Sequence, residues 1–301
     1  MIFSARSILK IGFVLSVFFL SFAYPVVPEI LCNNKTQPQW ISDIMKDINA
    51  QIDKYALPGG IVGIVIKDLT TGEYFSMNGN IIFNPASVIK VPVMVEAFHQ
   101  VEKGKLSLDE RLVLRQENKL VGSGSLQYFR CGKRFSVRRL IELMITDSDN
   151  TATNMLVNRL GMQNINEYMR RLGLRHTVIK DPTMFCKVEG QHNITSPVDM
   201  VILLEKMYKG TLVSKAASED MLSIMKGQRH KWGIARFLPP TVTIANKTGS
   251  LDFVRNDVGI ILDKDKPYVI SIFSKHLPSN HYGSILVGSL SKVVYERRKQ
   301  T

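Results

Sequence analysis

The chain has few cysteines, and they are not arranged to bind a metal or to exchange disulfides. Its 301 residues include three of them, Cys32, Cys131 and Cys186, and no two form a CxxC pair. Zinc-ribbon and thioredoxin-like sites are therefore excluded. In an oxidising compartment Cys131 and Cys186 could form a disulfide, and the alternative is that both are buried free thiols. We expect no metal and no other cofactor.

The sequence also lacks the short motifs of two large classes of hydrolase. It contains neither the GxSxG turn of the α/β-hydrolases nor the HExxH helix of zinc proteases, and its six histidines are scattered. A Ser-His-Asp arrangement assembled only in space is the least favoured alternative.

Beyond the N-terminus, no apolar run approaches the roughly 20 residues that a membrane-spanning helix needs. Residues 1–23 combine a basic start, a short apolar stretch and the small residues Ser21 and Ala23, which is typical of a signal peptide. We expect cleavage after Ala23, export to the bacterial periplasm, envelope or exterior, and no stable membrane insertion afterwards. A retained membrane anchor and a lipoprotein modified at Cys32 are the alternatives.

Acidic residues are too few to balance the basic ones, and the formal net charge is +13. The chain stays basic after loss of Arg6 and Lys10 with the signal peptide. A basic surface suits nucleic acid or an anionic envelope polymer, and export favours the polymer. The simpler alternative is a solvated face that keeps the protein soluble. We expect no nucleic-acid partner, and we expect a monomer.

The order of helical and β-rich segments indicates the fold class. Apolar periodicity predicts a helix over 40–55, and two β-rich runs after Gly59 predict a hairpin. Mostly helical segments follow over 84–235, and then come three β-rich runs and a helix over 282–298. Strands on both sides of a helical block predict an α+β fold, with one antiparallel sheet flanked by the terminal helices and a helical lobe beside it. Residues 24–39 would be a linker and 40–301 a single domain.

Ser87 and Lys90 form an SxxK pair at the start of a helix that follows Asn84 and Pro85. Three residues of helix make almost one turn, so Lys90 is expected beside Ser87 on one face. A serine hydroxyl needs an adjacent base, and a lysine can serve as one when its pKa is lowered. Three other SxxK matches lie in the predicted signal peptide or within helices, so only Ser87 is placed like a nucleophile.

Two further tripeptides gain meaning from their order. Ser148-Asp149-Asn150 lies between two helical runs, where a helix cap would be the ordinary interpretation. Lys247-Thr248-Gly249 lies on a predicted strand before Ser250, and its glycine would let a ligand approach the backbone. Either tripeptide alone is weak, but the two together after SxxK are a strong signal.

SxxK, SDN and KTG in this order resemble the signature of class A β-lactamases and penicillin-binding proteins. Their separations, SDNTATN and NDVGI are also similar to the class A pattern, from about Trp40 to the last helix. The resemblance implies the β-lactamase or DD-peptidase-like fold and a set of site residues. Catalytic residues would be Ser87 as nucleophile, Lys90 as its base and Ser148 as proton carrier. Asn150, Lys247, Thr248, Gly249 and Ser250 would bind substrate, with the N–H groups of Ser87 and Ser250 as the oxyanion hole.

The chain departs from the family in the loop that carries the glutamate for deacylation. Glu189 lies four residues before Asn193, as the resemblance requires, but Pro197 and Met200 follow too soon, so the loop is shorter or the glutamate is displaced. We take Glu189 as the candidate base and Asp181 as a second, and a solvated carboxylate is the alternative for Glu189. A basic residue that binds the substrate carboxylate is matched only by Arg255, which is offset.

The sequence therefore predicts an exported serine hydrolase that opens the β-lactam ring, or a related cell-wall amide, through an acyl-enzyme on Ser87. The alternatives are a cell-wall DD-peptidase or esterase and a penicillin-binding sensor that acylates but deacylates poorly. Envelope-polymer or nucleic-acid binding without catalysis is a more distant alternative.

Overall fold

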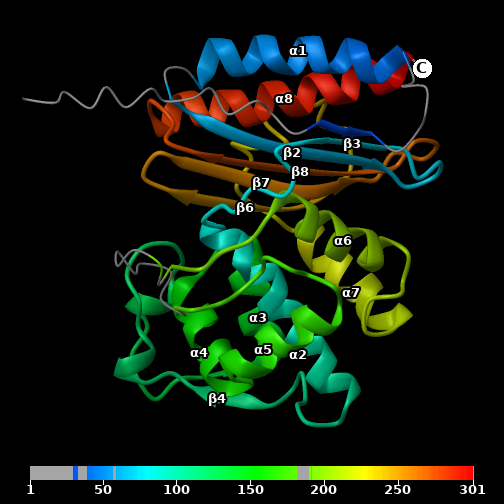
Figure 1. Cartoon of the computed structure of the whole chain (residues 1–301). Helices are drawn as coiled ribbons and strands as arrows, with labels where there is room; N and C mark the ends of the chain where they lie inside the picture. Colours follow the sequence, from blue (N-terminus) through cyan, green and yellow to red (C-terminus); the bar gives the residue numbers. More distant parts are fainter. Residues whose placement is uncertain (1–29, 33–38, 57–58, 182–189, 191, 301) are drawn as a thin grey trace, which may run out of the picture.

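The protein is built in layers around one sheet (Figure 1). The computed structural model describes residues 30–32, 39–56, 59–181, 190 and 192–300. Helices α1 (Gln39–Tyr55) and α8 (Asn280–Gln300) cover one face of the sheet, and a lobe made mainly of helices lies against the other.

The sheet is antiparallel throughout and has the strand order β1-β3-β2-β8-β7-β6. Its inner strands come from opposite ends of the chain, because β2 pairs along its whole length with β8. The strands are β1 (Ile30–Cys32), β2 (Ile61–Asp68), β3 (Tyr74–Met77), β6 (Ile244–Leu251), β7 (Val254–Ile261) and β8 (Tyr268–Lys275).

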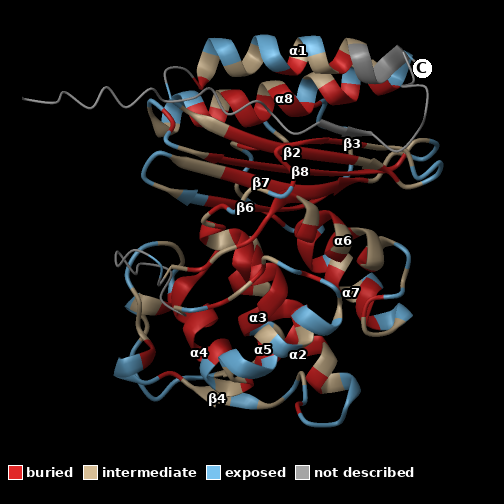
Figure 2. Cartoon of the chain, viewed as in Figure 1, coloured by how far each residue is buried: buried red, intermediate tan, exposed pale blue. Residues whose placement is uncertain are grey.

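Both faces of the sheet are buried, which explains the apolar run in β2 (Figure 2). Side chains alternate between the faces of a strand, so Ile64 and Ile66 pack toward α1 and α8, whereas Val65 belongs to the core of the lobe. From α1, Ile44 and Ile48 are fully buried against this first layer. The two hydrophobic cores therefore meet at the sheet.

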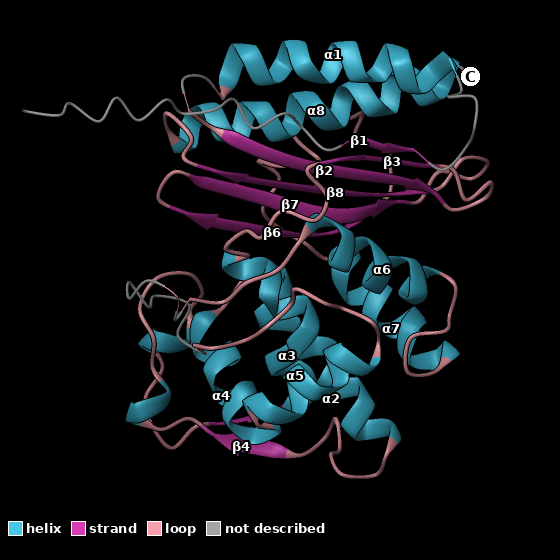
Figure 3. Cartoon of the chain, in the orientation of Figure 1, coloured by secondary structure: helices cyan, strands magenta, loops and turns pink. Residues whose placement is uncertain are grey.

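The lobe lies between β3 and β6 in the chain (Figure 3). A 3₁₀ turn, η1 (Ala86–Ile89), enters it, and a small ribbon of β4 (Arg111–Val113) and β5 (Arg134–Ser136) lies at its far end. The other elements are η2 (Gln116–Asn118), η3 (Leu126–Tyr128), α2 (Lys90–Glu102), α3 (Val137–Thr146), α4 (Asn150–Leu160), α5 (Met162–Arg171), α6 (Pro197–Tyr208) and α7 (Lys215–Lys226).

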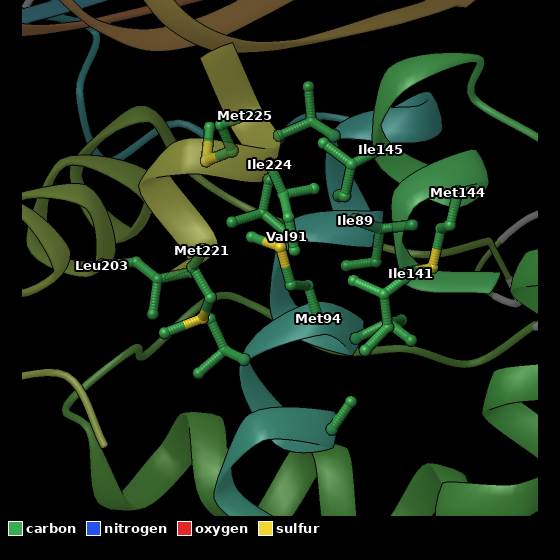
Figure 4. Packing of buried hydrophobic residues seen from close by; sticks show 14 of the residues in the cluster. Ile89, Val91, Met94, Ile141, Met144, Ile145, Leu203, Met221, Ile224 and Met225 are labelled. Carbon is green, nitrogen blue, oxygen red and sulfur yellow. The ribbon is translucent and has the colours of Figure 1, made fainter. Parts of the chain in front are cut away.

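Apolar side chains of α2, α3, α6 and α7 interlock beneath η1 (Figure 4). Ile89 at the end of η1 and Val91 at the start of α2 point into this cluster, together with Ile141 from α3 and Met221 from α7. Serine caps fix where several of these helices begin, as when Ser136 accepts the N–H of Arg139 and Ser214 that of Ala217. The turn before α2 is therefore supported by a buried apolar cluster.

The structure confirms the expected α+β class, with an antiparallel sheet, flanking helices and a helical lobe. It corrects one local expectation, because Ser87 lies on the 3₁₀ turn η1 and the α-helix begins only at Lys90. The strands β1, β4 and β5 were not predicted. The predicted signal peptide lies outside the described residues, and within them no helix is long and apolar enough to span a membrane.

The last helix is tied to the sheet by a buried ion pair between Arg298 and Asp68. Burial alone would raise the pKa of Asp68, but the hydrogen bond and charge of Arg298, with the N–H groups of Thr71 and Thr70, lower it overall. The guanidinium also lies 4.8 Å from the centre of the Tyr268 ring. Loss of Arg298 would leave a carboxylate with little solvent around it.

We expect Arg298→Met to lower the free energy of unfolding by about 3 kcal/mol, because removal of one partner strands a buried charge. Its neighbour gives a matched control: Arg297 pairs with Asp47 at 2.7 Å, but its side chain is 36% exposed. Arg297→Met should cost no more than about 1 kcal/mol. Urea denaturation of both variants is the measurement, and equal losses would contradict a special role for the buried pair.

Candidate active site

Ser87 lies where the lobe meets the sheet, on the turn η1 beside β6. Two asparagines hold the approach to it: Asn84 Oδ1 accepts the N–H of Ala86 at 3.0 Å, and Asn256 Nδ2 donates to the Asn84 carbonyl at 2.9 Å. Ala86 has a positive φ of 48°, which is uncommon for a residue with a Cβ. The backbone is thus held in a strained turn that leaves Ser87 partly exposed while Val88 is buried.

Lys90 follows one turn later, and its side chain is completely buried. Its amine donates to the Ser148 carbonyl at 2.7 Å, to Ser148 Oγ at 3.1 Å and to Asn150 Oδ1 at 2.8 Å. Burial, and then the nearby charge of Lys247, hold the pKa of Lys90 well below its usual range, although Asp149 opposes them. A neutral amine has a lone pair, so Lys90 can accept a proton.

Ser148 links two buried lysines, because its Oγ accepts from Lys90 Nζ and from Lys247 Nζ, each at 3.1 Å. Its backbone is held in a left-handed conformation, with φ at 55°. Asp149 fixes this turn: its Oδ1 caps α4 at the Ala152 N–H, and its Oδ2 accepts the N–H of Leu126. When Lys90 loses its proton, the hydroxyl of Ser148 can donate to it, so proton transfer between these groups needs little movement.

Asn150 is held by the loop between η2 and η3. Its Nδ2 donates to the Val121 carbonyl at 2.9 Å, and its backbone N–H donates to the Ser123 carbonyl at 3.0 Å. The side-chain oxygen accepts from Lys90, so both ends of the Asn150 amide already have protein partners. One side of the site is therefore formed by main-chain atoms that no sequence motif marks.

β6 brings the remaining predicted residues to the site. Lys247 is fully buried, and besides Ser148 its amine donates to the Thr248 carbonyl at 2.8 Å. A Cβ on Gly249 would lie 2.6 Å from the Pro85 carbonyl oxygen, so glycine is what allows β6 to approach η1. Ser250 follows on the same strand, at the edge of the sheet. The backbone near Ser87 and the backbone near Ser250 are thus brought together.

One residue near Lys247, Asp257, was not predicted from the sequence to belong to the site. Asp257, on β7, is completely buried; it accepts from Asn246 Nδ2 at 3.0 Å and from the N–H of Ile234 at 2.7 Å. Burial raises the pKa of Asp257 to about 7. Burial also lowers the pKa of Lys247 to about 7, against the opposing charge of Asp257. The NDVGI run contained the signal, because an acidic residue within an otherwise apolar buried strand is rare unless it has a partner.

The two candidate deacylation bases are placed differently. Glu189 lies outside the described residues. Asp181, at the edge of that segment, is partly buried, and its backbone N–H and carbonyl are held by the side chain of Asn193. Asn193 also accepts the N–H of Lys180, so it fixes the base of the loop.

Arg255 and Cys131 complete the predicted residues. Arg255 pairs with Ser250 across β6 and β7, but its Nε donates to Ser284 and its guanidinium lies over Trp232, on the α8 side. Cys131 is an exposed free thiol, and its possible partner Cys186 lies outside the described residues. Within the described residues, no group of three or more acidic, histidine or cysteine side chains could hold a metal ion.

Known proteins share this fold and part of this sequence. The chain is 25% identical to Beta-lactamase BRO-1 of Moraxella catarrhalis over 236 residues. This alignment covers 74% of this chain and 75% of that protein. A β-lactamase structure from Sphaerobacter thermophilus superposes with a TM-score of 0.81 at 29% identity and covers 86% of this chain and 98% of its own. The structure of PBP-A gives a TM-score of 0.80 at 31% identity and covers 87% and 97%.

A family model extends the agreement over most of the molecule. The Beta-lactamase enzyme family matches residues 43–297, which run from α1 to the end of α8 and so include the sheet, the lobe and the site between them. The expected resemblance is confirmed: the chain belongs to the beta-lactamase enzyme family and is a class A-like serine hydrolase.

Proposed function

We propose that this protein opens the ring of β-lactams through an ester on Ser87 and then hydrolyses that ester. The observation that carries the proposal is the Ser148 hydroxyl held between two buried lysines, because this arrangement can take a proton from one side and return it on the other. Support also comes from PBP-A, a variant of which is known as an acyl-enzyme complex with penicillin G.

In the acylation step, Ser87 Oγ attacks the carbonyl carbon of the lactam, and its proton passes to the neutral amine of Lys90. The ring C–N bond then breaks, and the leaving nitrogen takes a proton from Ser148 Oγ. Ser148 recovers a proton through its contacts with the two lysines. Burial and the charge of Lys247 lower the pKa of Lys90, which makes its amine a better proton acceptor than an exposed lysine.

Binding and charge stabilisation would come from β6. We assign Lys247, Thr248 and Ser250 to the carboxylate of the substrate, and Asn150 to its side-chain amide. The N–H groups of Ser87 and Ser250 would donate to the developing oxyanion, since Gly249 brings their backbones together. Residues 1–23 would direct export of the protein. The mature protein would act as a monomer and would bind its substrate outside the cytoplasm.

For Ser87→Ala we expect no covalent adduct with a penicillin and a fall of at least about 1,000-fold in kcat/KM, because the nucleophile is lost. Intact-protein mass and release of product from a chromogenic cephalosporin would be followed together. Ser223→Ala is the matched control, since Ser223 belongs to another SxxK match but is exposed on α7.

The same measurement separates the two alternatives from β-lactam turnover. A wild-type adduct that persists without turnover would indicate a penicillin-binding sensor or a slow peptidase. Neither adduct nor turnover would overturn the proposal.

Deacylation would use Glu189 to take a proton from water. We expect Glu189→Gln to form the acyl-enzyme at the wild-type rate but to release it at least about 100-fold more slowly, because general-base catalysis is removed. Asp181→Asn should release it normally. If Asp181→Asn released the acyl-enzyme slowly and Glu189→Gln released it at the wild-type rate, Asp181 would be the base for deacylation instead.

Affinity for substrate should depend on pH through Lys247. Its pKa is about 7, so its positive charge is present below neutral pH and is lost as the pH rises. We expect KM for a penicillin carboxylate to increase above about pH 7. Asp257→Asn removes a charge that raises the pKa of Lys247, so the increase in KM should begin at lower pH. Asp252→Asn, on an exposed residue of the same hairpin, is the control; a profile unchanged in Asp257→Asn would contradict the coupling.

A further inference from the structure

The positive charge of the chain is concentrated in one short part of the lobe. Between residues 111 and 139 there is a single acidic residue, Glu117, although the formal net charge of the whole chain is +13. The segment includes β4, β5 and the first turn of α3, at the end of the lobe away from the sheet (Figure 3). Its eight basic residues are Arg111, Arg115, Lys119, Arg130, Lys133, Arg134, Arg138 and Arg139.

The pairing of β4 with β5 turns two of these arginines outward together. Leu112 lies opposite Phe135, and both pack on the core of the lobe. Side chains alternate along a strand, so Arg111 and Arg134 lie on the other face of the ribbon, diagonally across the two strands, and both are exposed. The apolar face of this ribbon is therefore held against the lobe, and the opposite face presents positive charge.

Much of this charge is not neutralised within the protein. Arg138 is paired with Asp220, and Arg139 with Glu142. In contrast, Arg111, Arg130, Lys133 and Arg134 have no ion-pair partner in the described part of the chain, and Arg115 only approaches Glu117, at 3.8 Å with both side chains about two thirds exposed. Salt bridges of the last kind are weak and open readily.

A groove of about 360 Å³ runs beside the ribbon. Arg111, Arg115 and Arg159 line it together with Asn118 and Asn158, the apolar residues Leu112, Val113 and Met155 form another part, and Glu117 is its one acidic lining residue. Arg159 is held in place by a two-pronged pair with Glu110, at 2.6 and 2.9 Å. The groove thus offers donors for anionic groups beside an apolar surface.

We propose that the β4–β5 ribbon and this groove bind a linear, phosphate-bearing polymer that has no bases. Guanidinium groups match the oxygens of phosphate in pairs, and six of the eight basic residues are arginines. The groove has no aromatic side chain on which a nucleobase could stack, which disfavours nucleic acid. It is also hollow, and the exposed apolar residues Val121 and Tyr128 are not among its lining, which disfavours a bilayer.

Such binding is independent of the catalytic proposal, because none of these basic residues belongs to the active site. Residues of the groove and residues that support the active site are nevertheless close to each other in the sequence. Asn118 lines the groove, and the following residues provide the Val121 carbonyl that holds Asn150. A polymer bound at the ribbon would keep the enzyme attached to its surroundings without covering Ser87.

The test is to measure the binding of sodium polyphosphate to the full mature protein by titration calorimetry at several salt concentrations. The variant Arg111→Gln/Arg115→Gln/Arg134→Gln removes three exposed charges of the ribbon and groove. The control variant Lys46→Gln/Lys54→Gln/Lys264→Gln removes three exposed charges from α1 and the turn before β8. Both variants have the same net charge, and circular dichroism with the rate of β-lactam hydrolysis would check that both are folded.

We expect the arginine variant to bind polyphosphate at least tenfold more weakly, with a salt slope reduced by about 2 to 3, while the control binds as wild type. Equal losses in both variants would show that only net charge matters and would overturn the proposal. It would also be overturned by absence of binding, or by tighter binding to vesicles containing phosphatidylglycerol or to an oligothymidylate with the same number of phosphates.

Discussion

The active site depends on two lysine amines that the fold forces to share one serine hydroxyl. Removing two cations from water is unfavourable, and placing them on either side of Ser148 adds their mutual repulsion. Burial lowers the pKa of both lysines, to about 7 for Lys247, so a proton is lost from either amine more readily, and the buried Asp149 and Asp257 lie nearby. The burial and repulsion that lower the pKa of Lys90 therefore also lower the stability of the folded protein. Packing in the two hydrophobic cores has to offset that loss.

Rigid surroundings keep this arrangement from relaxing. Ser148 is fixed by the cap that Asp149 provides, Asn150 by two carbonyls of the neighbouring loop, and Ser87 by the turn that Asn84 and Asn256 hold. Each of these anchors comes from a different element, so the site exists only when lobe and sheet are docked. Preorganised donors of this kind need little movement during the reaction.

The sequence was sufficient for the parts of the protein that local pattern determines. The apolar period of α1, the hairpin of β2 and β3, and the motifs at Ser87, Ser148 and Lys247 were all recognisable. The 3₁₀ turn at Ser87 was not, because packing against β6 rather than propensity selects it. Nor was the role of the Val121 carbonyl, since any residue supplies the same main-chain atom. Asp257 becomes meaningful only once β7 is known to lie beside Lys247.

The pairing of β2 with β8 also affects how the molecule can form. Every residue of β2 finds its partner in the last strand of the chain, and the entire lobe is made between them. Contacts so distant in sequence form slowly, and until β8 arrives β2 exposes an apolar edge that can pair with other chains. A chain of this design stays incomplete through most of its synthesis. In the proposed export, this delay would keep the chain unfolded enough to pass through a membrane. The sheet would then be completed only after β8 had been transported.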